Sequence, residues 1–304
     1  MSRNRATLIG FTAVLQWALL ALFTIGSAPV PPLLLNAMCF AIGGVLGLIW
    51  TLTNGRGHVL KAVPIGVYVF GTLGLFGAHF LYFTAFRMAP LAETGLIAYL
   101  WPLIIVLLSG LLPGESLRPL HILGAVVAFI GAALIVLRGG GAMDANALPG
   151  FGVALIFALT WAVYSVLSRR LGNVPTESVT VFCLAASLLS AVAHLALETT
   201  IWPQSALGWA SVAALGIGPV GLAFFTWDIG MKRGDIQVLG VASYAAPLLS
   251  TLALVGAGIT HPSSTIAIAA GLIAGGAALA ARASQRGASR CEASAVTVTP
   301  ATGG

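Results

Sequence analysis

The chain contains few charged residues for its length. Only 7% of its 304 residues are Asp, Glu, Lys or Arg, whereas about 25% is usual in a soluble domain. Hydrophobic residues make up 59% of the chain before its 37 glycines are counted. So few polar groups cannot cover the surface of a soluble fold, and the sequence therefore predicts an integral membrane protein.

The chain also lacks the patterns of enzymes, metal sites and disulfide frameworks. Its three cysteines, Cys39, Cys183 and Cys291, are far apart, without Cys-x-x-Cys spacing. It contains no His-Glu-x-x-His, no Gly-x-Ser-x-Gly and no cluster of intramembrane carboxylates. We expect no cofactor and no metal, and an intramembrane enzyme is a remote alternative. Basic residues stand singly or in pairs, which argues against nucleic-acid binding.

Long apolar runs alternate with turn sequences along the whole chain. A spanning helix needs about 20 apolar residues, and ten such runs lie at about 6–25, 31–53, 63–85, 93–113, 120–137, 150–168, 177–197, 208–228, 237–259 and 265–281. Lipid offers no hydrogen-bond partner to a strand edge, and a barrel would show alternating rather than continuous apolarity. The predicted fold class is all-α, with ten transmembrane helices.

The basic residues predict how these helices are oriented. With a cytoplasmic N-terminus, the outer segments hold two of the 14 basic residues, Arg87 and Arg138. The inner segments hold the other twelve: Arg3, Arg5, Arg56, Lys61, Arg118, Arg169, Arg170, Lys232, Arg233, Arg282, Arg286 and Arg290. Basic residues accumulate on the cytoplasmic side, so both termini are expected in the cytoplasm.

The two halves of the chain repeat each other. A shift of 145 residues places Tyr99-x-x-Pro102-Leu103 on Tyr244-x-x-Pro247-Leu248, and Gly131-Ala132-Ala133-Leu134 on Gly276-Ala277-Ala278-Leu279. The sequence predicts two five-helix repeats, residues 1–148 and 149–283. Residues 284–304, rich in Ser, Ala, Thr and Gly, are expected to form a disordered cytoplasmic tail.

An odd number of helices in each repeat gives the two copies opposite membrane orientations. Such inverted repeats are typical of secondary transporters, which bind substrate near the midplane and open to each side in turn. A channel usually shows charged rings or a repeated filter, so the pattern favours a carrier. A monomer would be sufficient, and the sequence is silent on the oligomeric state.

Glycines recur at helical spacing in several spans. Gly43-x-x-x-Gly47, Gly71-x-x-Gly74-x-x-Gly77 and Gly271-x-x-x-Gly275 are the clearest cases. Small residues let helix backbones approach closely, so we expect these glycines to lie at helix crossings.

Two prolines predict breaks in the fourth and ninth helices. Pro102 and Pro247 each remove the hydrogen bond to the carbonyl four residues earlier, which belongs to Ala98 or Ser243. Irregular backbone at membrane depth is tolerated where it faces protein or a wet cavity. We therefore expect Pro102 and Pro247 to be helix-break or gating positions beside a cavity.

The candidate substrate site consists of rings and hydroxyls near mid-membrane. Interfacial tryptophans are common, so mid-span ones indicate a cavity, and the polar tips of His and Tyr would be unsatisfied in lipid. His79 is a candidate for substrate contact or proton linkage, whereas Glu93 and Asp228 are expected near the two interfaces. The predicted substrate-binding residues are Trp17, His79, Tyr82, Tyr99, Trp101, Trp161, Tyr164, Trp227, Ser243 and Tyr244.

The two halves resemble the ten-helix EamA-type branch of the drug/metabolite transporter superfamily, and within it the YddG-like aromatic amino acid exporters of bacterial inner membranes. The resemblance spans about residues 6–281. It depends on Arg5-Ala6-Thr7-Leu8-Ile9-Gly10 running to Trp17, Tyr99-Leu100-Trp101-Pro102-Leu103, and Ser243-Tyr244-Ala245-Ala246-Pro247-x-Leu249-Ser250 following Gly234-Asp235.

The resemblance implies export of Phe, Tyr, Trp and other small amphiphilic metabolites through a central cavity between the repeats. An aromatic lining fits, because substrate rings stack on Trp and Tyr faces. No Arg or Lys stands mid-span to pair a substrate carboxylate, so His79, tyrosine hydroxyls or freed backbone would do so. Gln16 and Trp17 replace the acidic residue of small proton-exchanging relatives, which argues against antiport. Broad export of other amino acids or cationic amphiphiles is the alternative.

Overall fold

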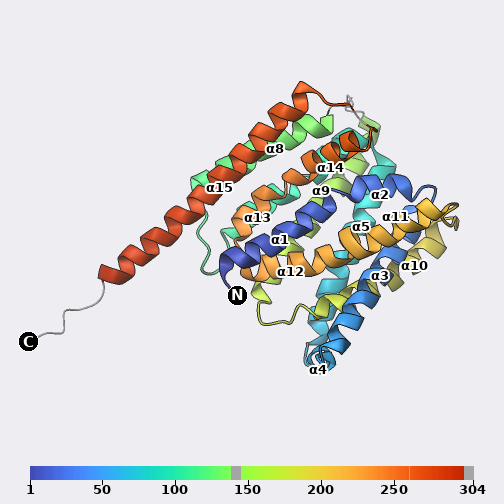
Figure 1. Ribbon diagram of the computed structural model, residues 1–304, viewed down its shortest axis with the longest axis horizontal. Coiled ribbons are helices and arrows are strands. Elements are labelled where there is room, and N and C mark those ends of the chain that lie inside the picture. The colour runs from blue at the N-terminus through green and yellow to red at the C-terminus, as the bar shows by residue number, and fades with distance from the viewer. Residues whose placement is uncertain (138–144, 260, 298–304) are drawn as a thin grey trace, which may run out of the picture.

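Helix is the only regular secondary structure in the computed structural model, which describes residues 1–137, 145–259 and 261–297 (Figure 1). Among these residues, nine helical segments are long and apolar enough to cross a membrane, and Glu93–Ser109 is a shorter apolar segment. The all-α membrane fold expected from the sequence is confirmed.

The first half contains five spans, two of which are interrupted. They are formed by α1 (Arg3–Trp17) with α2 (Leu20–Gly26), α3 (Pro32–Thr53), α5 (Ile65–Met88), α6 (Leu91–Ala98) with α7 (Trp101–Ser109), and α8 (Pro119–Val136). A short helix, α4 (Gly57–Lys61), lies in the connection after α3. The fourth span ends before the expected residue 113, because the turn-forming Pro113-Gly114 pair, in which Gly114 has a φ of 78°, follows it.

The second half follows the same order after a short 3-10 turn, η2 (Ala145–Ala147). Its spans are α9 (Leu148–Arg170), α10 (Ser178–Leu197), α11 (Ala206–Ile217) with the π-helix η3 (Gly218–Leu222) and α12 (Ala223–Arg233), α13 (Ile236–Ala242) with α14 (Ala245–Gly256), and α15 (Ser264–Thr297). Figure 1 shows α15 beside α8 and extending past the bundle.

The last helix is longer than the sequence pattern predicts. α15 continues as helix to Thr297 instead of ending near residue 281. Residues 282–293 include three Ala, three Arg, one Gln and one Glu, which have high helix propensity, so a helix can continue beyond the apolar run. Residues 298–304 of the expected tail, like Arg138, lie outside the described residues.

The fourth and ninth spans are broken where the prolines predict. Tyr99 and Leu100 separate α6 from α7, and Ser243 and Tyr244 separate α13 from α14. Each proline lies in the first turn of the second segment, where its missing N–H removes no intrahelical hydrogen bond. The expectation that the Ser243 carbonyl is free is wrong, because it accepts from the Ala246 N–H at 3.1 Å in a tight turn.

Glycine contacts hold two helix pairs close together. A Cβ atom on Gly43 would lie 2.6 Å from the Gly221 Cα, so this expected crossing is confirmed. The prediction for Gly271 and Gly275 is wrong, because a Cβ at either position would meet no atom within 4 Å. Gly276 makes the contact with α8 instead, since each residue turns the helix face by about 100°.

Candidate substrate site

Four tryptophans from four spans meet in one group near the middle of the bundle, here called the tryptophan cluster: Trp17, Trp101, Trp161 and Trp227. The ring centroids of Trp17 and Trp227 lie 5.0 Å apart, and those of Trp17 and Trp161 lie 5.9 Å apart. The Trp101 ring packs edge-on against each of the other three, at 5.8–6.4 Å. The structure therefore brings together residues that lie 210 positions apart, from 17 to 227.

Hydrogen bonds orient two of these indoles. The Trp17 Nε1–H donates to the Pro219 carbonyl at 3.0 Å, and the Trp227 Nε1–H donates to the Ser165 hydroxyl at 3.1 Å. Pro219 lies in η3, where a π-helix displaces backbone groups from the usual α-helical ladder. Sequence reasoning missed Pro219 and Ser165, although the helix-breaking run Gly216-Ile217-Gly218-Pro219-Val220-Gly221 marks an irregular segment.

The tryptophan cluster is closely packed rather than the lining of an open space. Trp101, Trp161 and Trp227 are 7%, 5% and 2% exposed, whereas Trp17 is half-buried. Phe224, which the sequence prediction did not include, packs on both Trp17 and Trp161. Of the four rings, Trp17 is thus the one with a partly exposed surface, and the other three are covered by their neighbours.

His79 lies beside the tryptophan cluster and contacts it through Phe224. Its ring lies 5.6 Å from the Phe224 ring and 5.0 Å from that of Phe40. His79 Nδ1 lies 2.8 Å from the Leu75 carbonyl, which can only accept, so Nδ1 carries the hydrogen. In a neutral ring Nε2 is then an acceptor, which suits a substrate ammonium group. Phe40 was also missed by sequence reasoning.

Three of the predicted site tyrosines, Tyr82, Tyr99 and Tyr164, lie in different surroundings. Tyr164 packs on Trp161 at 5.4 Å and is buried beside the tryptophan cluster. Tyr82, one turn from His79 on α5, is half-buried and packs on Phe83, Phe86 and Phe157. Tyr99 is half-buried at the break between α6 and α7.

Ser243 and Tyr244 lie apart from the tryptophan cluster, in a second core between α8, α13, α14 and α15. Both residues are fully buried. The Ser243 hydroxyl donates to the Leu239 carbonyl at 2.8 Å, and the Tyr244 hydroxyl accepts from the Leu103 N–H at 3.0 Å. The structure thus does not bring these two predicted site residues to the tryptophans.

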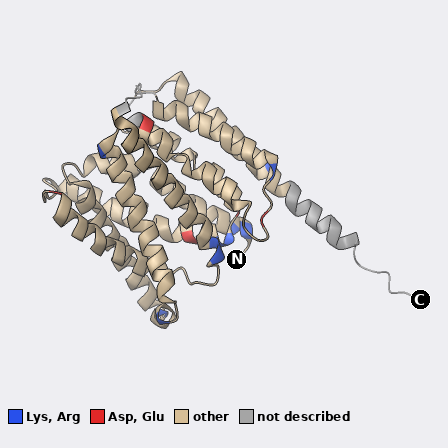
Figure 2. Ribbon diagram, turned by 180° about the vertical axis from the view of Figure 1, so that it is seen from behind, with Lys and Arg blue, Asp and Glu red and all other residues tan. Residues whose placement is uncertain are grey.

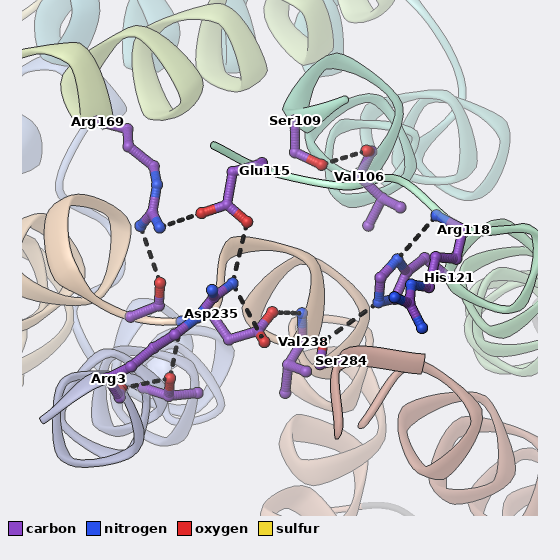
Figure 3. A network of polar contacts seen from close by, with 12 residues as sticks. Arg3, Val106, Ser109, Glu115, Arg118, His121, Arg169, Asp235, Val238 and Ser284 are labelled. Carbon is purple, nitrogen blue, oxygen red and sulfur yellow. Dashed lines mark hydrogen bonds and ion pairs between the residues drawn. The ribbon is translucent and has the colours of Figure 1, made fainter. Parts of the chain in front are cut away.

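One end of the bundle, here called the N-terminal end, is closed by a network of charges (Figure 3). Arg3 lies 3.0 Å from Glu115 and 3.4 Å from Asp235, and Arg169 pairs with the other oxygen of Glu115. Arg169 also donates to the Met231 and Gly234 carbonyls at the end of α12. Figure 2 shows the basic residues around the N-terminus.

A buried ion pair lies on α12, one residue after Trp227. Asp228 is 2.8 Å from Lys232 and accepts from the Thr176 hydroxyl at 2.7 Å. The Lys232 ammonium also donates to the Val174 carbonyl at 3.0 Å. Asp228 therefore joins α12 to the connection between α9 and α10 and does not face the tryptophan cluster with a free charge.

The other end of the bundle, here called the opposite end, has two buried carboxylates with different surroundings. Glu198 accepts from the backbone N–H groups of Leu33 and Leu34 and contacts His194 at 2.9 Å and Arg87. Burial alone would raise the pKa of Glu198, but these hydrogen bonds hold it below its usual range. Glu93 is 9% exposed, and neither of its carboxylate oxygens has a hydrogen-bond partner among the described residues.

Aromatic rings predominate at this site in the part of the chain that the structure describes. No group of three His, Cys, Asp or Glu side chains there is placed to hold a metal ion. What the site provides is aromatic faces, one imidazole acceptor and two broken helices near the middle of a membrane bundle.

Comparisons with known proteins agree with this architecture. The sequence profile described as the EamA-like transporter family matches residues 4–137 and, a second time, residues 148–282. An aromatic amino acid exporter YddG of Ancylobacter novellus is 54% identical over 92% of this chain and 98% of its own length. Another of that name, from Salmonella typhimurium, is 28% identical over 83% of this chain and 88% of its own length. A solved crystal structure that is 53% identical superposes with a TM-score of 0.91, over 94% of this chain and 99% of the other.

Proposed function

This chain belongs to the EamA-like transporter family, and from that premise we propose that it exports aromatic amino acids across a bacterial inner membrane. It is a multi-pass membrane transporter and not an enzyme. The observation that carries the proposal is the 54% identity to an aromatic amino acid exporter over nearly the full length of both chains. Both termini then lie in the cytoplasm, as the distribution of basic residues predicts.

Alternating access by two inverted five-helix repeats is the mechanism we infer. The family profile matches twice, with starting positions 144 residues apart, which supports a duplication. The broken spans also correspond: the 145-residue shift places α6 on 236–243 and α7 on 246–254, where α13 and α14 lie. An odd number of spans in each copy makes the copies antiparallel, and exchange of their conformations moves the opening from one side to the other.

The tryptophan cluster is the substrate site in this mechanism. Aromatic rings prefer tilted or edge-on neighbours at 4.5–7 Å, and each favourable pair adds about 0.5–1.5 kcal/mol beyond area burial. When the repeats move, the substrate ring would take the place of one indole beside its neighbouring indole. The His79 imidazole would accept a hydrogen bond from the substrate ammonium group. Recognition by ring faces alone would also admit other amphiphiles, and this is the basis of the broad-specificity alternative.

Transport into vesicles distinguishes the two functions. We expect purified protein in proteoliposomes to carry labelled phenylalanine and tryptophan and to carry labelled threonine at least about tenfold more slowly. Equal fluxes would support the broad-specificity exporter. Absence of flux for both aromatic amino acids, with correctly inserted protein, would overturn the proposed function.

The site is tested by the combined His79→Ala, Tyr99→Ala and Trp101→Ala variant. We expect aromatic flux to fall by at least about tenfold, because several ring contacts are lost together. The matched control is Trp209→Ala, since Trp209 is an exposed ring that stacks on Trp202 and lies outside the cluster. Unchanged flux in the combined variant would remove the site assignment without removing the proposed function.

A further inference from the structure

One hydrogen bond connects the two broken spans directly. The Leu103 N–H in the first turn of α7 donates to the Tyr244 hydroxyl, which belongs to the break between α13 and α14, at 3.0 Å. Tyr244 is fully buried, and its ring packs edge-on against Phe129 of α8 at 5.9 Å. The bond therefore joins backbone of the first half to a side chain of the second half inside the protein.

The break in the fourth span explains why Leu103 needs this partner. The first N–H groups of any helix have no intrahelical acceptor, and α7 begins at Trp101. Pro102 has no N–H, so Leu103 carries an early donor of α7 that must be satisfied at membrane depth. The Tyr244 hydroxyl satisfies it and acts as a cap from the other half.

Both partners have counterparts under the same 145-residue shift. Tyr99 corresponds to Tyr244, and Leu103 corresponds to Leu248. Leu248 directly follows Pro247 and is the fourth residue of α14, as Leu103 directly follows Pro102 and is the third residue of α7. The chain thus contains a second tyrosine and a second early helix N–H that could make the same bond, with the roles of the halves exchanged.

The packing of the four half-helices is asymmetric in this structure. At the N-terminal end α7 packs against α13. At the opposite end α6 packs against α5, α8 and α9, whereas α14 packs against α1, α2, α8 and α15. Under the repeat relation the contact between α7 and α13 corresponds to one between α14 and α6. Tyr99 agrees with this asymmetry, because it is half-buried whereas Tyr244 is fully buried.

We propose that the two tyrosines exchange roles when the transporter changes state. In the state closed at the N-terminal end, the Tyr244 hydroxyl caps the Leu103 N–H. In the state closed at the opposite end, the Tyr99 hydroxyl caps the Leu248 N–H, and α6 packs against α14. Tyr99 and Tyr244 are therefore positioning residues that stabilise opposite states. This inference rests on the proposed alternating access of inverted repeats.

The test uses paired hydroxyl deletions and a reporter of the N-terminal end. Ser109 is fully buried at the end of α7, so Ser109→Cys, with the three native cysteines replaced by alanine, reacts with a thiol reagent only when this end opens. Labelling rates are measured in nanodiscs without substrate. Tyr244→Phe should raise the rate about fivefold, and Tyr99→Phe should lower it about fivefold, because each removes one buried hydrogen bond from one state.

The double variant Tyr99→Phe and Tyr244→Phe should label at a rate close to that of the unmodified reporter protein, since both states then lose one cap. Amide exchange of a peptide containing Leu103 should rise in Tyr244→Phe and not in Tyr99→Phe. Shifts of labelling in the same direction, or no shift in Tyr99→Phe, would overturn the inference even if Tyr244→Phe failed to fold. Labelling is measured without substrate. A lack of aromatic amino acid transport in proteoliposomes would therefore overturn the proposed function but would not affect this test.

Discussion

The two ends of the bundle hold their charges in different ways. At the N-terminal end Glu115 lies between Arg3 and Arg169, and Arg3 also contacts Asp235, so the network includes α1, the α7–α8 connection, α9 and the turn before α13. At the opposite end Glu198 joins α3, α5 and α10, three spans that pack on one another. The first arrangement involves residues next to α7 and α13, which pack on each other, whereas the second involves neither helix.

This difference suggests which charges would separate in the proposed mechanism. In the proposed alternating access, opening of the N-terminal end would move α7 away from α13, and the ion pairs of Glu115 and Asp235 lie beside these two helices. Glu198 joins spans whose contacts need not change in that movement. We therefore expect substitutions at Glu115 to change the population of states as well as stability, and substitutions at Glu198 to change stability alone.

The largest effect is expected for Glu115→Ala. Removal of this carboxylate leaves Arg3 and Arg169 without their shared partner, and breaking a largely buried ion pair costs about 3 kcal/mol. Thermal unfolding followed by tryptophan fluorescence should show a lower Tm, and the Ser109→Cys reporter should label at least tenfold faster. Arg3→Gln is the control, because Arg3 is half exposed and the Glu115–Arg169 pair survives. A lower Tm without faster labelling would show that the network does not close this end.

The next largest effect is expected for Glu198→Gln. The amide keeps one acceptor oxygen for the Leu33 and Leu34 N–H groups but loses the charge that faces Arg87, so the free energy of unfolding should fall by about 2 kcal/mol. The Ser109→Cys reporter should label at the rate of the unmodified protein, as a change of stability alone requires. Accelerated labelling would contradict the comparison between the two ends.

A smaller effect on the Tm is expected when the pH is lowered. The fold depresses the pKa of Glu198, so its contribution to stability is complete above the ordinary carboxyl pKa and is lost as the pH falls through the depressed value. The Tm of the unmodified protein should therefore decrease across that acidic range more steeply than the Tm of Glu198→Gln. Parallel pH curves for the two proteins would show that Glu198 is not the group responsible.

Local sequence patterns were sufficient for the fold but not for the details of the site. Apolar runs and prolines act within one helix, so the ten spans and the breaks just before Pro102 and Pro247 could be predicted. Contacts across the halves could not. The tryptophan cluster needs partners such as Phe224 and the Pro219 carbonyl, and Glu115 meets Arg3 across 112 residues.

Tyr244 also shows that local patterns do not predict contacts between the halves. Its residue type and its match to Tyr99 predicted a substrate contact, and nothing local indicates that its hydroxyl caps a helix in the other half. The glycines of α15 give a second example. Their spacing identifies a stripe of small residues but not which residue of the stripe faces α8.

The smallest effect is expected for Glu93→Gln at the opposite end, where this buried acid has no hydrogen-bond partner within residues 1–137, 145–259 and 261–297. Burial of an unpartnered carboxylate is unfavourable, whereas its position in the first turn of α6 favours a negative charge by about 0.3–1 kcal/mol. An isosteric amide removes the charge and therefore both of these opposing effects. The free energy of unfolding should change by less than about 0.5 kcal/mol. Glu115→Gln, measured in parallel, changes the same groups but removes two ion pairs, so it should lower the Tm by several degrees. Equal losses in the two variants would mean that Glu93 interacts with a charged group, and the contrast between the paired Glu115 and Glu93 would then be wrong.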